Sequence, residues 1–407
     1  MAQQRPRASK KSSVVLTSPA TALGGSGYRF WQTGLCYFWL LSPSHRQCLG
    51  VVDLPALSGS EDVYLQDSWY VAAWANEIAD KPLGRIILGE PIVLLRDPNG
   101  VPHALEDRCC HRKVRLSGGK VIGDRLQCPY HGLEYNFDGA CVRVPGQSRV
   151  PPAATIRKYA VVERWQLIWI WMGDPDKADE TSIPNWWQMD HPEWRVPKGN
   201  LLHVSCNYEL LIDNLLDLSH VTYVHASSIG TQEVGDVAAS VSKISDGVRS
   251  TRWIFCCPPA PFHTKVAGIT SPIDRWQISD AVVPCFVLLD LGAAPAGTGA
   301  EQGDRSKALE FRVFNAAVPE TESTTHYFFA HARRFQLENP VVDKIFANDF
   351  VNVFLEDKAM LDEQQRMMDL DPGEFRIDIN ADAAGLQFRR LLKRRIESAP
   401  ERTSVNS

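Results

Sequence analysis

The sequence predicts an α+β fold of two domains, because its strand-like and helical segments are segregated along the chain instead of alternating. Short strand-like runs separated by turns fill residues 85–171, and longer runs fill residues 237–333. Helical periodicity is confined to residues 208–224, to residues 339–368 and to a stretch near the C-terminus. A chain of 407 residues is long enough for two or three domains of ordinary size.

The first domain is expected to be all-β and to span residues 63–175, and the second to span residues 176–400. Within the first, the Asp-Pro-Asn-Gly sequence at 97–100 predicts a hairpin turn between two strands. A segment rich in Pro, Asp and Trp at 174–200 is typical of a connection between domains.

Residues 1–62 differ from the rest, since they are rich in Ser, Gly and Pro and lack any alternation of apolar residues. We expect either a disordered extension or a segment that precedes the true start of the chain, which would lie near Val63. The basic start followed by the apolar run 30–41 mimics a signal peptide. Cysteines kept for a metal site argue against export.

Composition and charge exclude several classes of protein. The formal net charge is −5, so neither nucleic acid nor an anionic membrane surface is indicated as a partner. No run of about 18 uncharged apolar residues is present, so no membrane span is expected. The ten cysteines form no evenly spaced disulfide framework. We therefore expect a cytoplasmic protein.

Two Cys/His pairs, Cys109-x-His111 and Cys128-x-x-His131, are separated by sixteen residues. Two Cys and two His could bind zinc. Each pair supplies one Cys and one His, however, which suits a Rieske [2Fe–2S] centre, where one iron takes two thiolates and the other takes two imidazoles. The string Cys-Pro-Tyr-His-Gly at 128–132 is very specific for such a centre, so iron–sulfur is favoured over zinc.

A second candidate metal site lies in the helical stretch 208–224. Asn214, Asp217 and His220 recur at i, i+3 and i+6 and would share one helix face. His225 lies five residues after His220, so the helix must end or distort before His225 if both bind one ion. Two His and one carboxylate form the facial triad of non-haem Fe(II) oxygenases.

The carboxylate of that triad has two candidates. Asp217 fits on spacing alone, but Asp357 follows an apolar run at helical spacing, which would place it at the buried edge of a helix. The alternative is that Glu356 and Asp357 are solvated surface charges, as most acidic residues are.

Both motifs together resemble the large subunits of Rieske non-haem iron oxygenases over about residues 64–370. Within that family the chain is similar to vanillate O-demethylase and phenoxybenzoate dioxygenase-type oxygenases. The resemblance implies a helix-grip (START-like) catalytic domain after the Rieske domain. It implies that Asp217 bridges to a cluster histidine of a neighbouring subunit in a homotrimer, and that Asn214 lies near the iron. The implied ligands are Cys109, His111, Cys128 and His131 for the cluster, and His220, His225 and Asp357 for a mononuclear Fe(II).

The resemblance also implies a function. A flavin/ferredoxin-type reductase would pass electrons from NAD(P)H to the cluster, and the enzyme would use O₂ to oxygenate a carboxylated aromatic ether in aromatic catabolism. O-demethylation of a methoxybenzoate and angular attack on a diaryl ether both remain open, as does ring dioxygenation of another aromatic acid such as a phthalate. The alternatives from other classes are a Rieske electron-transfer protein without a second iron, and a helix-grip binding protein with structural zinc. The candidate partners for a substrate carboxylate are Arg252, His263, Lys265 and Arg275.

Overall fold

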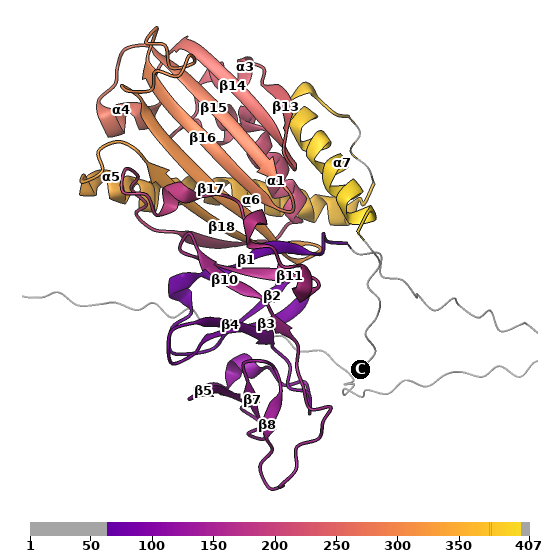
Figure 1. Cartoon of the computed structure of the whole chain (residues 1–407). Helices are drawn as coiled ribbons and strands as arrows, with labels where there is room; N and C mark the ends of the chain where they lie inside the picture. Colours follow the sequence, from indigo (N-terminus) through magenta and orange to yellow (C-terminus); the bar gives the residue numbers. More distant parts are fainter. Residues whose placement is uncertain (1–62, 374, 376, 400–407) are drawn as a thin grey trace, which may run out of the picture. The chain divides into compact units, whose positions relative to one another are not determined.

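The computed structural model describes residues 63–373, 375 and 377–399, so the prediction for residues 1–62 lies outside the described residues. The described residues form four antiparallel sheets, and helices are concentrated after residue 207. Figure 1 shows the strand-rich N-terminal part in indigo to magenta and the large sheet with its helices in magenta to yellow. The predicted α+β class is confirmed.

Three small sheets make up the N-terminal domain. The hairpin turn predicted at 97–100 is present, since the Gly100 amide donates to the Asp97 carbonyl oxygen. All side chains of the central strand β11 are buried, which explains its unbroken apolar sequence. The strands are β1 (Ser68–Trp74), β11 (Leu167–Met172) and β10 (Val161–Arg164); β2 (Leu83–Ile87), β3 (Glu90–Arg96), β4 (Pro102–Glu106) and β9 (Lys158–Tyr159); and β5 (Lys120–Ile122), β6 (Arg125–Gln127), β7 (Glu134–Asn136) and β8 (Cys141–Arg143).

The C-terminal domain is built on one seven-stranded sheet in the order β12-β18-β17-β16-β15-β14-β13. Every neighbouring pair in it is antiparallel, so consecutive strands from β13 to β18 form a meander. The strands are β12 (Asn200–Val204), β13 (Ser240–Ile244), β14 (Gly247–Cys257), β15 (Ile273–Val282), β16 (Phe286–Pro295), β17 (Leu309–Thr321) and β18 (Thr324–Arg333).

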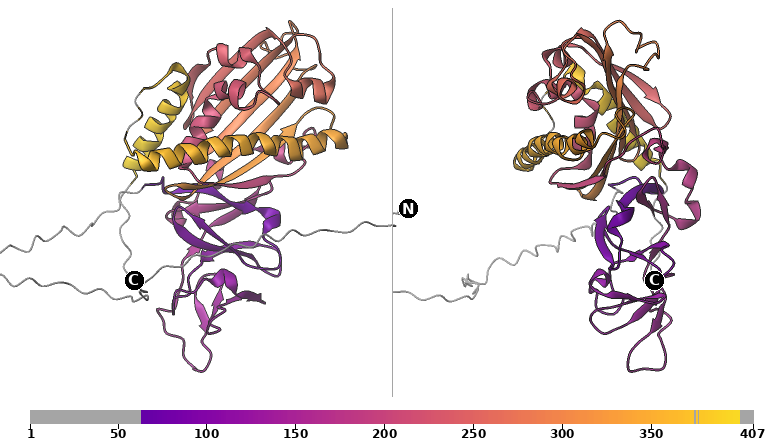
Figure 2. Two further views of the ribbon diagram at one scale, coloured as in Figure 1. Left: turned by 180° about the vertical axis from the view of Figure 1, so that it is seen from behind. Right: turned by 90° about the vertical axis from the view of Figure 1, so that its left-hand side faces the viewer.

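Three helices pack on one face of this sheet. Helix α1 (Tyr208–Leu216) contacts β15, β16 and β17, and it also contacts α6 (Phe350–Leu370) and α7 (Ala383–Glu397). Figure 2 shows α6 running across the sheet with α7 beside it. A sheet that wraps one face around a helix is the helix-grip arrangement that the resemblance implied. No helix of the described residues is long and apolar enough to cross a bilayer.

The helix that carries the second motif ends earlier than the sequence predicted. Helix α1 ends at Leu216, because Asp217 adopts an extended backbone with φ −106° and ψ 90°. The Asp217 carboxylate then accepts the Ser219 amide and begins a short 3-10 turn, Leu218–His220. The prediction that Asn214, Asp217 and His220 share one helix face is therefore wrong.

The helix predicted at 339–368 is also built in pieces. It begins with α5 (Pro340–Lys344), widens into a π-helical turn at Ile345–Asp349 and continues as α6. Such π-helical turns insert one extra residue into a helix and are frequent at functional sites. Here the turn immediately precedes the part of α6 that carries Asp357.

Candidate active site

Two histidines and one aspartate meet between the broken helix and α6. His220 closes the 3-10 turn, His225 follows the short helix α2 (Val221–Val224), and Asp357 lies on α6. The Asp357 Oδ1 atom lies 3.0 Å from His225 Nε2 and 3.3 Å from His220 Nε2. Ligand atoms around one ion lie roughly 3 Å apart, because each bond to the metal is about 2.1 Å long. Among the described residues, this is the one group of three His, Cys, Asp or Glu side chains close enough to share an ion.

Hydrogen bonds behind the rings orient both histidines. His220 Nδ1 lies 2.6 Å from the Asp217 carbonyl oxygen, and His225 Nδ1 lies 2.7 Å from Glu356 Oε2. A carbonyl or carboxylate oxygen accepts a hydrogen bond, so Nδ1 is the donor in each contact, and a neutral ring then offers its Nε2 atom, on the side of Asp357, to a metal. Partners of this kind fix the ring orientation and raise the basicity of metal-binding histidines.

Burial decides between the two candidate carboxylates. Asp357 is 4% exposed, so the alternative of a solvated surface charge does not hold for it. Burial alone would raise its pKa, but the adjacent imidazoles of His220 and His225 outweigh burial and hold the pKa well below its usual range. The Asp217 carboxylate points elsewhere, since its oxygens accept from Ser219 and lie 3.8 Å from Arg252.

Glu356 is the residue of this site that the sequence reading left without a role. Its carboxylate is partly exposed, yet it reaches the ring nitrogen of the almost fully buried His225. The only sequence signal is its place next to Asp357 after an apolar helix face, and that pattern does not distinguish a histidine partner from a surface charge.

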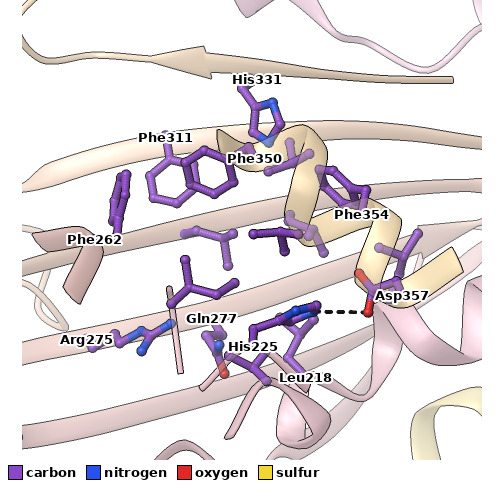
Figure 3. Close-up of a pocket in the computed structure, with 18 of the residues that line it drawn as sticks. Leu218, His225, Phe262, Arg275, Gln277, Phe311, His331, Phe350, Phe354 and Asp357 are labelled. Atoms are coloured by element: carbon purple, nitrogen blue, oxygen red, sulfur yellow. Dashed lines mark hydrogen bonds and ion pairs between the residues drawn. The ribbon is translucent and has the colours of Figure 1, made fainter. Parts of the chain in front are cut away.

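The three side chains line one end of a mostly apolar cavity between the sheet and the helices. Figure 3 shows His225 and Asp357 at the opposite end of the cavity from Phe262, with Arg275 and Gln277 on one side and His331 on the other. The residues that line it are Asn214, Leu215, Leu218, His220, Val221, His225, Ile229, Phe262, His263, Arg275, Trp276, Gln277, Leu289, Leu291, Gly292, Phe311, Val313, His331, Phe350, Val353, Phe354 and Asp357.

The four residues of the first motif come together in pairs within the N-terminal domain: His111 with His131, and Cys109 with Cys128. Cys109 and Cys128 are each 2% exposed, whereas His111 and His131 are exposed, and the two imidazole rings lie 4.7 Å apart. Burial raises the pKa of the Cys128 thiol, against backbone N–H groups of Tyr130 and His131 that favour the thiolate. Two inner thiolates and two outer imidazoles are the donor set of a Rieske centre.

Local hydrogen bonds shape both cluster loops. Gly132, at φ +70°, closes the second loop by donating its amide to the Cys128 carbonyl oxygen. The Tyr135 hydroxyl lies 3.1 Å from Cys109 Sγ and 3.2 Å from Cys110 Sγ. Cys110 is exposed, and its thiol shares the tyrosine hydroxyl with Cys109.

Known proteins agree with this arrangement. Residues 68–159 match the Rieske [2Fe-2S] domain, and residues 204–398 match the vanillate O-demethylase oxygenase C-terminal domain. The iron-sulfur subunit of a toluene-4-sulfonate monooxygenase system from Comamonas testosteroni is 39% identical over 83% of this chain and 98% of its own. The vanillate O-demethylase oxygenase subunit of a Pseudomonas species is 38% identical over 83% of this chain and 97% of its own. The crystal structure of dicamba monooxygenase bound to 3,6-dichlorosalicylic acid has a TM-score of 0.77 and 34% identity, covering 82% of this chain and 98% of that one.

The chain combines a cluster site in a β domain with a site of two histidines and one carboxylate in a helix-grip domain. This combination defines an iron-dependent oxygenase. The chain belongs to the Rieske non-haem iron oxygenases, in the group that contains the vanillate O-demethylase oxygenases. The predicted enzyme class and the predicted cofactors, a [2Fe–2S] cluster and a mononuclear iron supplied with electrons from NAD(P)H through a reductase, are thereby confirmed. The roles of individual residues and the domain boundaries stay predictions.

Proposed function

We propose that this chain is the terminal oxygenase of a two-component system that oxygenates a carboxylated aromatic ether, by O-demethylation of a vanillate-like methoxybenzoate. The observation that carries the proposal is the placement of His220, His225 and Asp357 at one end of an apolar cavity. Three protein ligands on one side of an ion leave positions open on the side that faces the cavity.

In this proposal His220, His225 and Asp357 bind the iron, which when bound supplies the activation of O₂. The chain's own side chains hold and shield the site. Asn214 donates to Asp357 Oδ1 over 3.3 Å and helps to fix the carboxylate that both histidines approach. Apolar walls from the sheet and α6 exclude water around a bound ring, which strengthens each polar contact inside the cavity.

We further propose that Cys109, His111, Cys128 and His131 hold the cluster, and that electrons reach the iron site between subunits of a homotrimer. No cluster ligand lies among the described residues that line the iron cavity, which leaves room for a connection from another subunit. His131 is exposed, and a quarter of the Asp217 side chain is exposed, so both offer polar atoms to a neighbour. In the trimer, Asp217 of one subunit would accept a hydrogen bond from His131 of the next.

A cytoplasmic location is also part of the proposal. All eight cysteines of the described residues are free, which agrees with a reducing compartment.

Angular attack on a phenoxybenzoate-like diaryl ether is the second candidate reaction, and ring dioxygenation of a phthalate-like acid the third. O-demethylation is favoured because the vanillate O-demethylase subunit is similar over nearly its whole length. O-demethylation transfers one oxygen atom of O₂ to the methyl carbon, consumes two electrons and two protons, and yields the phenol, formaldehyde and water.

The test is turnover of the purified oxygenase with a reductase and NADH on vanillate, 3-phenoxybenzoate and phthalate. We expect formaldehyde from vanillate in proportion to the O₂ consumed. Phenol release from phenoxybenzoate without any formaldehyde from vanillate would favour diaryl-ether cleavage. Uncoupled O₂ consumption with all three compounds would contradict the proposed substrate class.

A further inference from the structure

Arg275 is a buried cation without a protein partner. It lies on β15, lines the iron cavity and is 7% exposed. Its Nη1 atom is buried without any hydrogen-bond partner, and no carboxylate of the described residues forms an ion pair with its guanidinium. An unpaired charge of this kind costs several kcal/mol, so such groups are usually paired or removed from protein interiors.

Arg275 remains charged despite its burial. Burial lowers the pKa of its guanidinium to about 10, with nearby Cys257 and Glu233 opposing that shift and Arg252 adding to it. The side chain is therefore protonated at neutral pH, and the cavity contains a positive charge that the fold leaves unneutralised.

The other basic candidates for binding an anion are already engaged. Arg252 donates to the Gln277 side chain and to the Val237 carbonyl oxygen, and it approaches Asp217. Lys265 pairs with Asp349 and is exposed. Burial lowers the pKa of His263 to about 3, so this ring is neutral, and its Nδ1 atom already accepts the Ala260 amide. Of these four candidates, Arg275 alone combines charge, burial and an unused donor.

The place of Arg275 in the cavity suits an aromatic acid. Figure 3 shows Arg275 and Asp357 on different sides of the cavity, with Gln277 and His225 between them. Phe262 and Phe311 also line the cavity and offer ring contacts. A flat apolar ring with an oxyanion at one edge would fill this space, neutralise Arg275 and place its other edge towards His225 and Asp357.

We propose that Arg275 is the anion-binding residue of the cavity and receives the carboxylate or sulfonate of an aromatic substrate through its N–H donors. The planar guanidinium suits either oxyanion, because two parallel N–H groups can meet two of its oxygens. This role for Arg275 rests on the proposed function in one respect, namely that this cavity is the substrate site. Two of the similar proteins are named for action on toluene-4-sulfonate and vanillate, which are both aromatic oxyanions.

The experiment is calorimetric titration of the full-length, cluster-loaded protein with two matched ligand pairs in the absence of reductase. Vanillate is paired with neutral vanillyl alcohol, and toluene-4-sulfonate with neutral toluene-4-sulfonamide. Whichever anion binds more tightly identifies the oxyanion that the site prefers. Arg275→Gln should weaken the binding of that anion roughly tenfold to a hundredfold, as expected for charge-assisted hydrogen bonds. The affinity for its neutral analogue should stay unchanged.

Two further variants are matched to this one. Arg275→Lys keeps the charge and should retain part of the preference for the anion. Arg249→Gln removes an arginine of the same sheet that pairs with Asp280, partly exposed to solvent, and should bind as the wild type does. Equal affinity of the wild type and Arg275→Gln for both anions would overturn the inference.

A measurement on the unaltered protein keeps the inference testable even if Arg275→Gln does not fold. Benzoate should raise the melting temperature of the wild type and neutral benzamide should not, since only the anion neutralises the buried charge. Equal effects of the two compounds would overturn the inference. Neither binding test depends on turnover, so failed catalysis with intact anion binding would contradict the proposed function and leave the role of Arg275 standing.

Discussion

His225 is held between two neighbouring acidic residues of α6: its Nδ1 atom lies 2.7 Å from Glu356 Oε2, and its Nε2 atom lies 3.0 Å from Asp357 Oδ1. The ring is 1% exposed, so neither nitrogen can turn to water instead. Asp357 is therefore a candidate metal ligand, and Glu356 fixes the orientation of the His225 ring, which supplies a second candidate ligand.

Replacement of Glu356 should weaken iron binding without affecting the cluster. Glu356→Gln removes the charge that accepts the His225 Nδ1–H, and losses of such partners typically lower metal affinity about tenfold to a hundredfold. The measurement is iron affinity under chelator competition, with the visible spectrum of the cluster followed in parallel. Glu363→Gln is the control, because Glu363 lies on the same helix and pairs only with exposed Arg366. Equal iron affinity in both variants would show that Glu356 has no part in the site.

Replacement of Asp217 should block electron transfer while both metals stay bound. Asp217→Asn keeps an oxygen that can accept the Ser219 amide, so the turn before His220 should persist. The cluster should be reduced normally by dithionite but should no longer be reoxidised by O₂ in the presence of substrate. Ser219→Ala is the control, since it removes one contact of the carboxylate and leaves its charge. Full turnover of Asp217→Asn would rule out a bridging role.

Removal of the Tyr135 hydroxyl should lower the reduction potential of the cluster. The hydroxyl lies 3.1 Å from Cys109 Sγ, and hydrogen bonds to cluster sulfurs stabilise the reduced state. Tyr135→Phe is expected to shift the potential downwards on the order of tens of millivolts, measured by redox titration of the visible spectrum. Tyr159→Phe removes a hydroxyl of the same domain that donates to Glu90, and it should leave the potential unchanged. An unshifted potential in Tyr135→Phe would contradict a hydrogen bond to the ligand.

His331 should make the protein sensitive to acid. It is 2% exposed, and burial lowers its pKa from 6.5 to about 3, so below pH 6.5 the unfolded chain binds a proton that the folded chain rejects. The resulting stability is present above pH 6.5 and is lost as the pH falls towards 3, at about 1.4 kcal/mol per pH unit.

His331→Phe removes this loss and fits among the aromatic rings of Phe346, Phe350 and Phe354. The free energy of unfolding, measured by denaturant titration at pH 8 and pH 5, should fall about 2 kcal/mol less in the variant than in the wild type. Parallel losses in the two proteins would show that His331 does not titrate as its burial requires.

The sequence was sufficient to predict the ligand motifs, because Cys128 to Gly132 and the His220/His225 pair are short local patterns with strict chemical requirements. The α+β class and most strands also followed from local periodicity. The interruption of the helix at Asp217 did not, since it depends on a capping contact to Ser219 that competes with the helical hydrogen bonds.

Local sequence patterns did not predict contacts between residues that lie far apart in the sequence. Glu356 meets His225 across 131 positions of sequence, and only the packing of α6 against the sheet brings the two together. Arg275 was one of four equivalent basic candidates until burial and partner contacts separated it from Arg252, His263 and Lys265. In each case what was missing was the environment of the residue, which its sequence neighbours do not determine.

The coexistence of a cluster and a separate iron in one chain is tested most directly by counting iron in the wild type and in His225→Ala. We expect about three irons per chain in the wild type, two of them in the cluster, and about two in the variant, whose Rieske absorption spectrum is unchanged. Two irons per chain in a wild-type protein with a full Rieske spectrum, or the same iron count in both proteins, would contradict it.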